Sequence, residues 1–231
     1  MSIITRAYKG TPLTHNEVDN NFTELDTRPS GQTYPKTKGI GVKVDTSTPT
    51  WGWHDLLGAV DAYKTAGVNP PTSSIYRGGI RQYQFAVGEE IFIEFHMPHD
   101  YVPNTDMYIH THWSHIHSSL SGGGVTWAFE VSYSKGHNQA AFSAPITINA
   151  PQDASLIQYQ HMIDEVQLSA AGGAGGLLVT ENLEVDGIIL VRAALAGNTL
   201  SPTNEPFLHF IDIHYQTTHL GTKQKAPDFW T

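Results

Sequence analysis

Short segments that alternate between apolar and polar residues occupy most of the chain beyond residue 39. In a β-strand, such alternation places successive side chains on opposite faces. Gly, Pro and Asn separate the segments, for example at residues 69–71, 122–124 and 197–198. The pattern predicts a mainly β protein, with about eight to ten short strands in an antiparallel, jelly-roll-like β-sandwich. The predicted strands cover residues 40–44, 83–87, 91–96, 107–117, 125–133, 157–168, 187–192 and 207–215.

Two segments depart from this alternation. Residues 53–65 (WHDLLGAVDAYKT) are typical of a short helix, and the Ala/Gly tract at 170–176 is typical of a flexible loop. The chain has no internal repeat, which argues against a long β-helical spike.

The N-terminal segment predicts a short helix that begins at Thr14. Thr14 and Glu17 have the spacing of a capping box, and Leu13 and Val18 stand where a hydrophobic staple would close. A helix of about a dozen residues is marginal alone in water, so we expect it to dock on other copies or on another protein. Packing against its own domain is the alternative. The apolar side chains expected to form the attachment stripe are Leu13, Val18, Phe22 and Leu25.

The segment after this helix has the composition of a linker. Residues 27–38 (TRPSGQTYPKTK) contain two prolines. We therefore predict two parts, an N-terminal attachment helix and linker over residues 1–38 and a β-sandwich domain over residues 39–231.

Composition excludes several functions. Charged residues make up 15% of the chain, against about 25% in typical proteins, and the net charge of −9 comes with 13 Lys and Arg that form no basic cluster. Binding to nucleic acid or to an anionic membrane surface is therefore not expected. The chain has no cysteine, which excludes disulfides and thiolate metal sites. No apolar stretch is long enough for a spanning helix, so no membrane insertion is expected.

Residues 110–117 (HTHWSHIH) are the most unusual passage of the sequence. On a strand, the period of two places His110 and His112 on one face. The opposite face is then lined by Met107, Ile109 and Trp113. His115 and His117 would fall on that apolar face of a straight strand, so either a bulge lies near Ser114 or the strand ends there.

His110 and His112 are candidate metal ligands. Two imidazoles on one strand face can bind Fe or Zn when further ligands come from elsewhere, such as His96, His214 or symmetry-related copies. We expect these imidazoles only to make hydrogen bonds within a polar face, so that no cofactor is held, and metal binding is the alternative. In the last predicted strand, His209 shares a face with apolar residues and is expected to be a core histidine rather than a ligand.

No pattern of catalytic residues supports an enzyme. The sequence has no Gly-x-Ser-x-Gly elbow, no phosphate-binding glycine loop and no His-Glu-x-x-His helix. A cupin-like metal enzyme also carries His-x-His on a jelly-roll strand, but it requires a Glu four or five residues later, where this chain has Ile116 and His117. We therefore assign no catalytic residues. A metal-dependent jelly-roll enzyme is kept as an alternative.

Residues 9–25 (KGTPLTHNEVDNNFTEL) resemble the N-terminal segment of many tail-fibre and related virion proteins of tailed bacteriophages. Residues 95–101, residues 108–113 and the ending at 226–230 (APDFW) look like a β-domain that recurs in phage structural proteins. The resemblance implies a homotrimer that is attached to the virion by its N-terminus. Some phage fibres also bind iron through His-x-His motifs on the trimer axis, and His110 and His112 are the matching positions here.

The expected function is therefore that of a viral structural protein, a tail-fibre or spike-type subunit that contributes to host adsorption. It would be assembled in the host cytoplasm and reside in the virion. Expected partners are copies of itself, other virion proteins of the tail, collar or capsid, and a bacterial surface glycan or outer-membrane protein. Loops at 122–124, 134–138 and 171–176 are candidates for receptor contact, and the sequence does not choose among them. A head-decoration or head-fibre protein is the alternative.

Overall fold

A computed structural model of the chain describes residues 10–16, 18, 51–61 and 69–218. The chain divides into two compact units, residues 1–51 and residues 52–231. In the first unit, His15 and Asn16 are helical, and the backbone N–H of Val18 donates to Thr14 O at 3.0 Å. The helix thus begins where the capping pattern predicts.

Several N-terminal predictions lie outside the described residues. These are the stripe positions Phe22 and Leu25, the linker at 27–38, the domain boundary after residue 38 and the strand predicted at 40–44. Of the stripe, Leu13 and Val18 are described, and both are half-buried.

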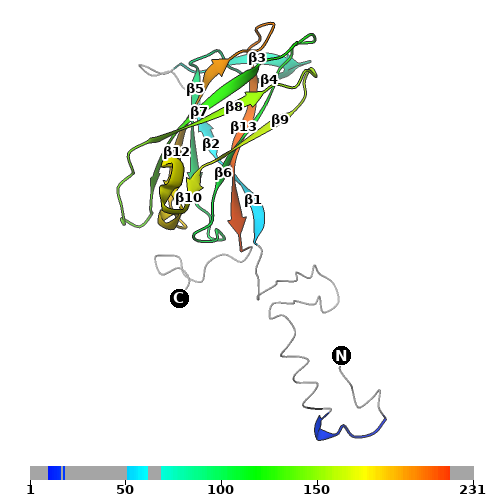
Figure 1. Cartoon of the computed structure of the whole chain (residues 1–231), viewed down its shortest axis with the longest axis vertical. Coiled ribbons are helices and arrows are strands. Elements are labelled where there is room, and N and C mark those ends of the chain that lie inside the picture. Colours follow the sequence, from blue (N-terminus) through cyan, green and yellow to red (C-terminus); the bar gives the residue numbers. More distant parts are fainter. Residues whose placement is uncertain (1–9, 17, 19–50, 62–68, 219–231) are drawn as a thin grey trace. The chain divides into compact units, whose positions relative to one another are not determined.

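The second unit is built from two antiparallel sheets, drawn in Figure 1. Sheet A consists of β1 (Gly52–Leu57), β3 (Thr72–Arg77), β4 (Ile80–Gln84), β6 (Tyr108–Ser114), β9 (Met162–Gln167) and β13 (Phe207–Thr217). Sheet B consists of β2 (Ala59–Asp61), β5 (Glu90–His96), β7 (Gly124–Ser134), β8 (Ile146–Asp153) and β12 (Ile188–Asn198).

The strand order is that of a jelly roll. In sheet A the order is β3-β4-β13-β6-β9, with β1 also paired to β13, and in sheet B it is β2-β5-β12-β7-β8. From β4 onward, the principal strands pair as in one long rolled hairpin: β4 with β13, β5 with β12, β6 with β9, and β7 with β8. Successive members of this series alternate between the two sheets, as in two interlocked Greek keys. The predicted jelly-roll-like sandwich is confirmed.

Large apolar side chains fill the space between the sheets. Trp127 of β7 meets Phe85 edge to face, with ring centroids 5.2 Å apart. Full burial of such a side chain contributes about 1.5–3 kcal/mol. This core therefore supplies most of the driving force for folding. The largest fully buried aromatic side chains are Trp113, Trp127, Tyr101, Phe85, Phe95, Phe129 and Phe207.

The helix predicted at residues 53–65 is wrong for the part that the structure describes. Residues 52–57 form β1 along the end of β13, and residues 59–61 form β2 along β5. Between them, Gly58 brings the backbone so close to Ile93 and Phe95 that an added Cβ would overlap their side chains. The chain passes from one sheet to the other here, and pairing with neighbouring strands outweighs the local helical pattern.

Other segments differ less from expectation. Strands β3 and β8 were not predicted, because their sequences are rich in Ser, Thr, Asn and Pro. The tract at 170–176 forms tight turns (η1, Ala171–Gly176) beside a short parallel pair, β10 (Ser169–Ala170) and β11 (Leu178–Val179), and is followed by η2 (Thr180–Asn182). Among the described residues, no helix has the length and hydropathy required to cross a bilayer.

Candidate functional site

His110 and His112 lie on the outer face of sheet A, on the side of β6 that points away from sheet B. Met107, Ile109 and Trp113 point into the core between the sheets and are fully buried. The predicted separation of the two sets is therefore what the structure shows. It follows from the two-residue period of the strand.

Cross-strand pairing brings acidic residues to the same face. Asp212 of β13 lies opposite His110, and Glu165 of β9 lies opposite His110 on the other side. His214, two residues after Asp212, lies opposite Asp55 of β1. Directly opposed residues of antiparallel strands point to the same face. Four strands thus supply one patch of imidazoles and carboxylates.

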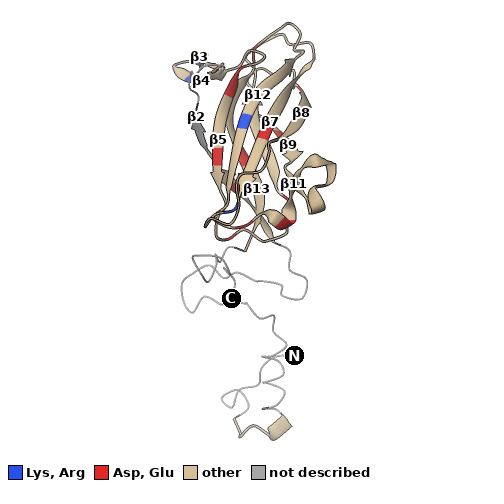
Figure 2. Ribbon diagram, turned by 90° about the vertical axis from the view of Figure 1, so that its left-hand side faces the viewer, with Lys and Arg blue, Asp and Glu red and all other residues tan. Residues whose placement is uncertain are grey.

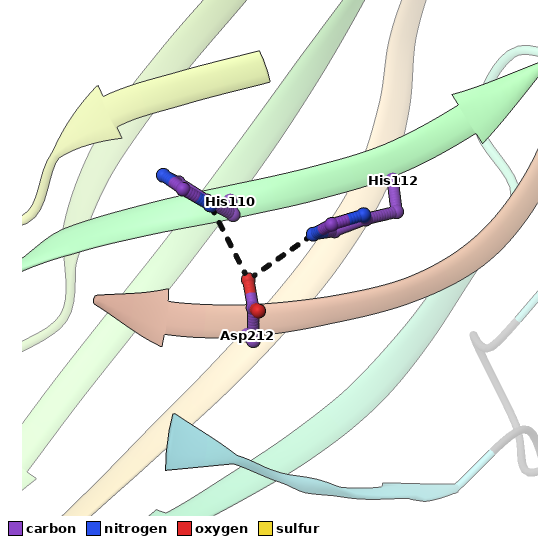
Figure 3. A group of neighbouring side chains, drawn as sticks. All are labelled: His110, His112 and Asp212. Carbon is purple, nitrogen blue, oxygen red and sulfur yellow. Dashed lines mark ion pairs between the residues drawn. The ribbon is translucent and has the colours of Figure 1, made fainter. Parts of the chain in front are cut away.

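The centre of this patch is the cluster of His110, His112 and Asp212, shown in Figure 3. Asp212 Oδ1 lies 3.5 Å from His112 Nε2 and 3.7 Å from His110 Nδ1. His110 is 6% exposed, His112 is 7% exposed and Asp212 is 2% exposed. Although the cluster lies on an outer face, the neighbouring side chains bury it almost completely.

The second nitrogen of each imidazole is engaged outside the cluster. His110 Nε2–H donates to Glu165 Oε2 at 2.6 Å, since a carboxylate can only accept. His112 Nδ1 shares a hydrogen bond of 2.8 Å with His161 Nε2, and the His112 ring stacks on Phe210 with centroids 3.8 Å apart. Both rings are therefore held in orientation by neighbours of the cluster.

A more exposed pair adjoins the cluster. His214 Nε2 lies 2.7 Å from Asp55 Oδ1, and its Nδ1 lies 3.7 Å from Glu165 Oε2. The His214 ring is tilted over the His110 ring, with centroids 3.5 Å apart. The side chain of Asp55 is 59% exposed, so this side of the patch is open to water.

Two atoms that face each other in the cluster lack hydrogen-bond partners. These are Asp212 Oδ1 and His112 Nε2, and both are buried. Burial lowers the pKa of His112 to about 4, helped by the nearby His161 and His110, so its imidazole is neutral at pH 7. Burial also raises the pKa of Asp212, an effect that the neighbouring His110 opposes. Two imidazole nitrogens and a carboxylate oxygen form a donor set suited to a transition-metal ion.

The other histidines considered from the sequence take different positions. His96 is not part of this patch: it lies with His99 and His137 around Asp186, at distances of 3.4, 3.0 and 2.8 Å from the carboxylate oxygens. His214, the second suggested ligand, does lie beside His110.

Of the two alternatives for residues 110–117, a bulge near Ser114 or a strand end, the structure shows the second: β6 ends at Ser114. His115 then leaves the strand, and its Nε2–H donates to Ser155 O at 2.7 Å in the protein interior. His209 was expected in the core, but a bulge between Leu208 and Phe210 turns it to Ser114 Oγ at 2.8 Å. The alternation of β13 could not reveal this bulge.

Sequence reasoning missed the acidic and outer partners of the two histidines. Asp212 and Glu165 lie in different strands from His110, and nothing local identifies them as its neighbours. The available signal was the alternation of β13, which predicts Asp212 and His214 on one face. Pairing of β13 with β6 was needed to connect that face to His110.

Comparisons with known proteins identify no family. No family model matches the sequence, and no curated protein matches it significantly. Among solved structures, this chain aligns with the CBM22-1 and GH10 modules of xylanase 10B from Clostridium thermocellum at 12% identity and a TM-score of 0.31. The alignment covers 70% of this chain but only 26% of that chain. CBM35 from Cellvibrio japonicus Abf62 aligns over 72% and 99%, at 8% identity and a TM-score of 0.33. Similarity this low carries no conclusion about the ligand or activity of this chain.

Proposed function

We propose that this chain is a structural subunit of a tailed-bacteriophage virion, of the tail-fibre or spike type, which acts by binding and not by catalysis. The observation that carries the proposal is the N-terminal sequence at residues 9–25, whose pattern resembles the attachment segments of such proteins. The helix start after Thr14 and the half-buried Leu13 and Val18 support it. In this proposal, Leu13, Val18, Phe22 and Leu25 contact another virion protein.

Self-association into a homotrimer is part of the proposal. Four apolar side chains, between 41% and 71% exposed, surround the histidines on the outer face of sheet A. They are Trp53, Leu57, Ile163 and Phe210. Exposed apolar groups on one face are typical of surfaces that associate. A trimer would present three copies of the loops at 122–124, 134–138 and 171–176, and multivalency strengthens weak contacts with a bacterial surface glycan or outer-membrane protein.

A catalytic role has less support. In the described part of the chain, the interior of the sandwich is filled by large apolar side chains such as Trp113 and Trp127. The imidazoles of His110 and His112 point to the opposite side of sheet A. A metal-dependent jelly-roll enzyme with its ligands inside the sandwich does not fit this arrangement.

A bound transition-metal ion, Fe or Zn, completes the proposal. The cluster of His110, His112 and Asp212 has the donor atoms that such ions prefer. In a structural subunit the ion would stabilise the domain, because an ion bound by the folded state alone shifts the equilibrium away from the unfolded chain.

The attachment role is tested by deleting residues 1–26 and supplying the shortened chain during infection. We expect a folded β-domain with the mass of a trimer in light scattering that is absent from purified particles. Because His15 is exposed, the His15→Ala variant of the full chain serves as the control and is expected to enter particles normally.

Two results would contradict the proposal. One is loss of β-structure in the circular dichroism of the deletion, which would make the segment part of the domain. The other is normal incorporation of the shortened chain. Recovery of the full chain with tail-free capsids would instead identify it as a head-decoration or head-fibre protein.

A further inference from the structure

We propose that one Zn²⁺ ion binds within a single chain, between β6 and β13, through His110 Nδ1, His112 Nε2 and Asp212 Oδ1. The inference rests on the metal component of the proposed function and specifies its ligands, ion and stoichiometry. An ion shared by three chains on a symmetry axis would need no carboxylate from the same chain. Here the carboxylate of Asp212 is already between the two imidazoles (Figure 3).

The distances in the cluster are those of ligands around an ion. The three donor atoms all lie within 4.8 Å of one another. The separations of 3.5 and 3.7 Å from Asp212 Oδ1 are too long for good hydrogen bonds. Zinc bonds of 2.0–2.1 Å at tetrahedral angles place ligand atoms about 3.4 Å apart. Right angles at the same bond lengths would place them at about 2.9 Å, which is shorter than either separation.

Hydrogen bonding outside the cluster leaves lone pairs directed into it. His110 donates Nε2–H to Glu165, so in a neutral ring its Nδ1 carries the lone pair that faces Asp212. When His112 donates Nδ1–H to His161, its Nε2 likewise carries a lone pair facing Asp212. Two lone pairs and a carboxylate oxygen then converge. Without a cation between them, this arrangement is electrostatically unfavourable.

The burial of the atoms supplies an independent argument. Asp212 Oδ1 and His112 Nε2 are buried without hydrogen-bond partners, and their residues are 2% and 7% exposed. Buried polar atoms in native proteins are nearly always satisfied, and an unsatisfied pair calls for an explanation such as an ion. An ion bound to both atoms, and to His110 Nδ1, satisfies all three at once.

The surroundings have the organisation of an outer coordination shell. A zinc-bound histidine typically donates its other N–H to a carboxylate, as His110 does to Glu165. Stacking on Phe210 and the bond to His161 orient His112 in the same way. Three protein ligands leave one position of a tetrahedral ion for water. The chain lacks cysteine, so thiolates do not compete for zinc.

The test uses the full chain, stripped with a chelator and titrated with Zn²⁺ by calorimetry, with metal and mass determined by elemental analysis and light scattering. We expect one zinc per chain, whatever the oligomeric state. The Asp212→Asn and His112→Gln variants should lose at least tenfold in affinity, and Glu165→Gln should lose about 10- to 100-fold through the outer shell. His137→Ala, which removes a histidine from the group around Asp186, is the matched control and should bind normally.

A second measurement uses the wild-type chain, so it does not depend on whether the variants fold. Co²⁺ added to the stripped wild-type chain should give the intense visible absorption of a four-coordinate ion, and Zn²⁺ should displace it. Weak absorption of a six-coordinate ion, or tighter binding of Fe²⁺ than of Zn²⁺ without oxygen, would overturn the zinc assignment.

Other outcomes would overturn the site itself. One metal per three chains would place the ion on a symmetry axis. Unchanged affinity in Asp212→Asn, loss of binding in His137→Ala, or no binding at all would each remove the cluster as the site. These results concern the isolated chain, so they are distinguishable from a failure of particle incorporation, which tests the proposed function separately.

Discussion

The two outer faces of the sandwich differ in how their carboxylates are neutralised. On sheet B, Arg192 of β12 donates from Nε to Glu90 and from Nη1 to Glu130 at 3.3 Å. Figure 2 shows this face, with the basic residue of β12 among acidic residues of the neighbouring strands. A guanidinium is always charged and offers several donors. The acidic side chains of this group therefore have a permanent counter-charge within the fold.

On the outer face of sheet A, the partners that the structure describes for Asp55, Glu165 and Asp212 are imidazoles. Asp212 faces His110 and His112, and Glu165 faces His110 and His214. A neutral imidazole presents either a donor or a lone pair, and it supplies no charge. The same strand alternation thus gives sheet B a group of carboxylates paired with an arginine. On sheet A, in our proposal, an added cation takes the place of that arginine. This difference between the two faces can be tested by unfolding experiments.

Zinc should stabilise the protein through sheet A alone. At a zinc concentration of a thousand times its dissociation constant, the free energy of unfolding should rise by about 4 kcal/mol, because only the folded state assembles the ligands. Denaturant unfolding at pH 7.5, with zinc or with a chelator, measures the effect. In the Asp212→Asn variant, whose affinity is at least tenfold weaker, the same zinc concentration should raise the free energy of unfolding by no more than about 2.7 kcal/mol. Equal stabilisation of wild type and variant would contradict the role of Asp212.

Removing Arg192 from the outer face of sheet B should destabilise the protein whether or not zinc is present. The Arg192→Met variant leaves Glu90, which is 4% exposed, without its counter-charge, and we expect a loss of roughly 2–3 kcal/mol in the free energy of unfolding. Adding Glu90→Gln should recover part of this loss. The exposed Arg81, changed to Met, is the control, and a similar loss there would show that the effect is not due to the pairing.

The group around Asp186 should give a smaller, pH-dependent effect. Burial raises the pKa of Asp186, but the hydrogen bond from His137 and the nearby His99 and His96 outweigh it and hold the pKa below its ordinary value. A lowered pKa means stabilisation that is present above the unfolded value of about 3.9 and lost as the pH falls through the folded value.

The Asp186→Asn variant should therefore be about 1 kcal/mol less stable than the wild type at pH 7. The difference should shrink below about pH 4. Unfolding curves measured from pH 3 to pH 8 follow it, with the exposed Asp153→Asn as the control. A difference that stays constant over this range would mean that the ionised carboxylate is not the stabilising group.

Much of the fold could be predicted from the sequence because its causes are local. The alternation around β5, β6, β7 and β13 reflects one face against the core and one face away from it. The two-residue period of a strand also places His110 and His112 on the face of β6 opposite to Ile109 and Trp113. The capping pattern at Thr14 likewise depends on residues within one turn of the chain.

Segments whose conformation depends on pairing with another strand were predicted less well. Residues 53–57 have a helical pattern, yet β13 offers an edge that pairs with them. The bulge between Leu208 and Phe210, which turns His209 away from the core, depends on the register with β6. Local preference is weak compared with the hydrogen bonds and burial that a neighbouring strand supplies.

The β-sandwich and the shared outward face of two histidines could both be predicted from the alternation of residues along the chain. The side chains that contact these two histidines depend on how the strands pair. Glu165 lies 55 residues from His110, and His161 lies 49 residues from His112. Their approach follows from the jelly-roll pairing of β6 with β9 and β13. Strand pairing is non-local, so neither the carboxylate of Asp212 nor the outer partners could be assigned before the register of the sheet was known.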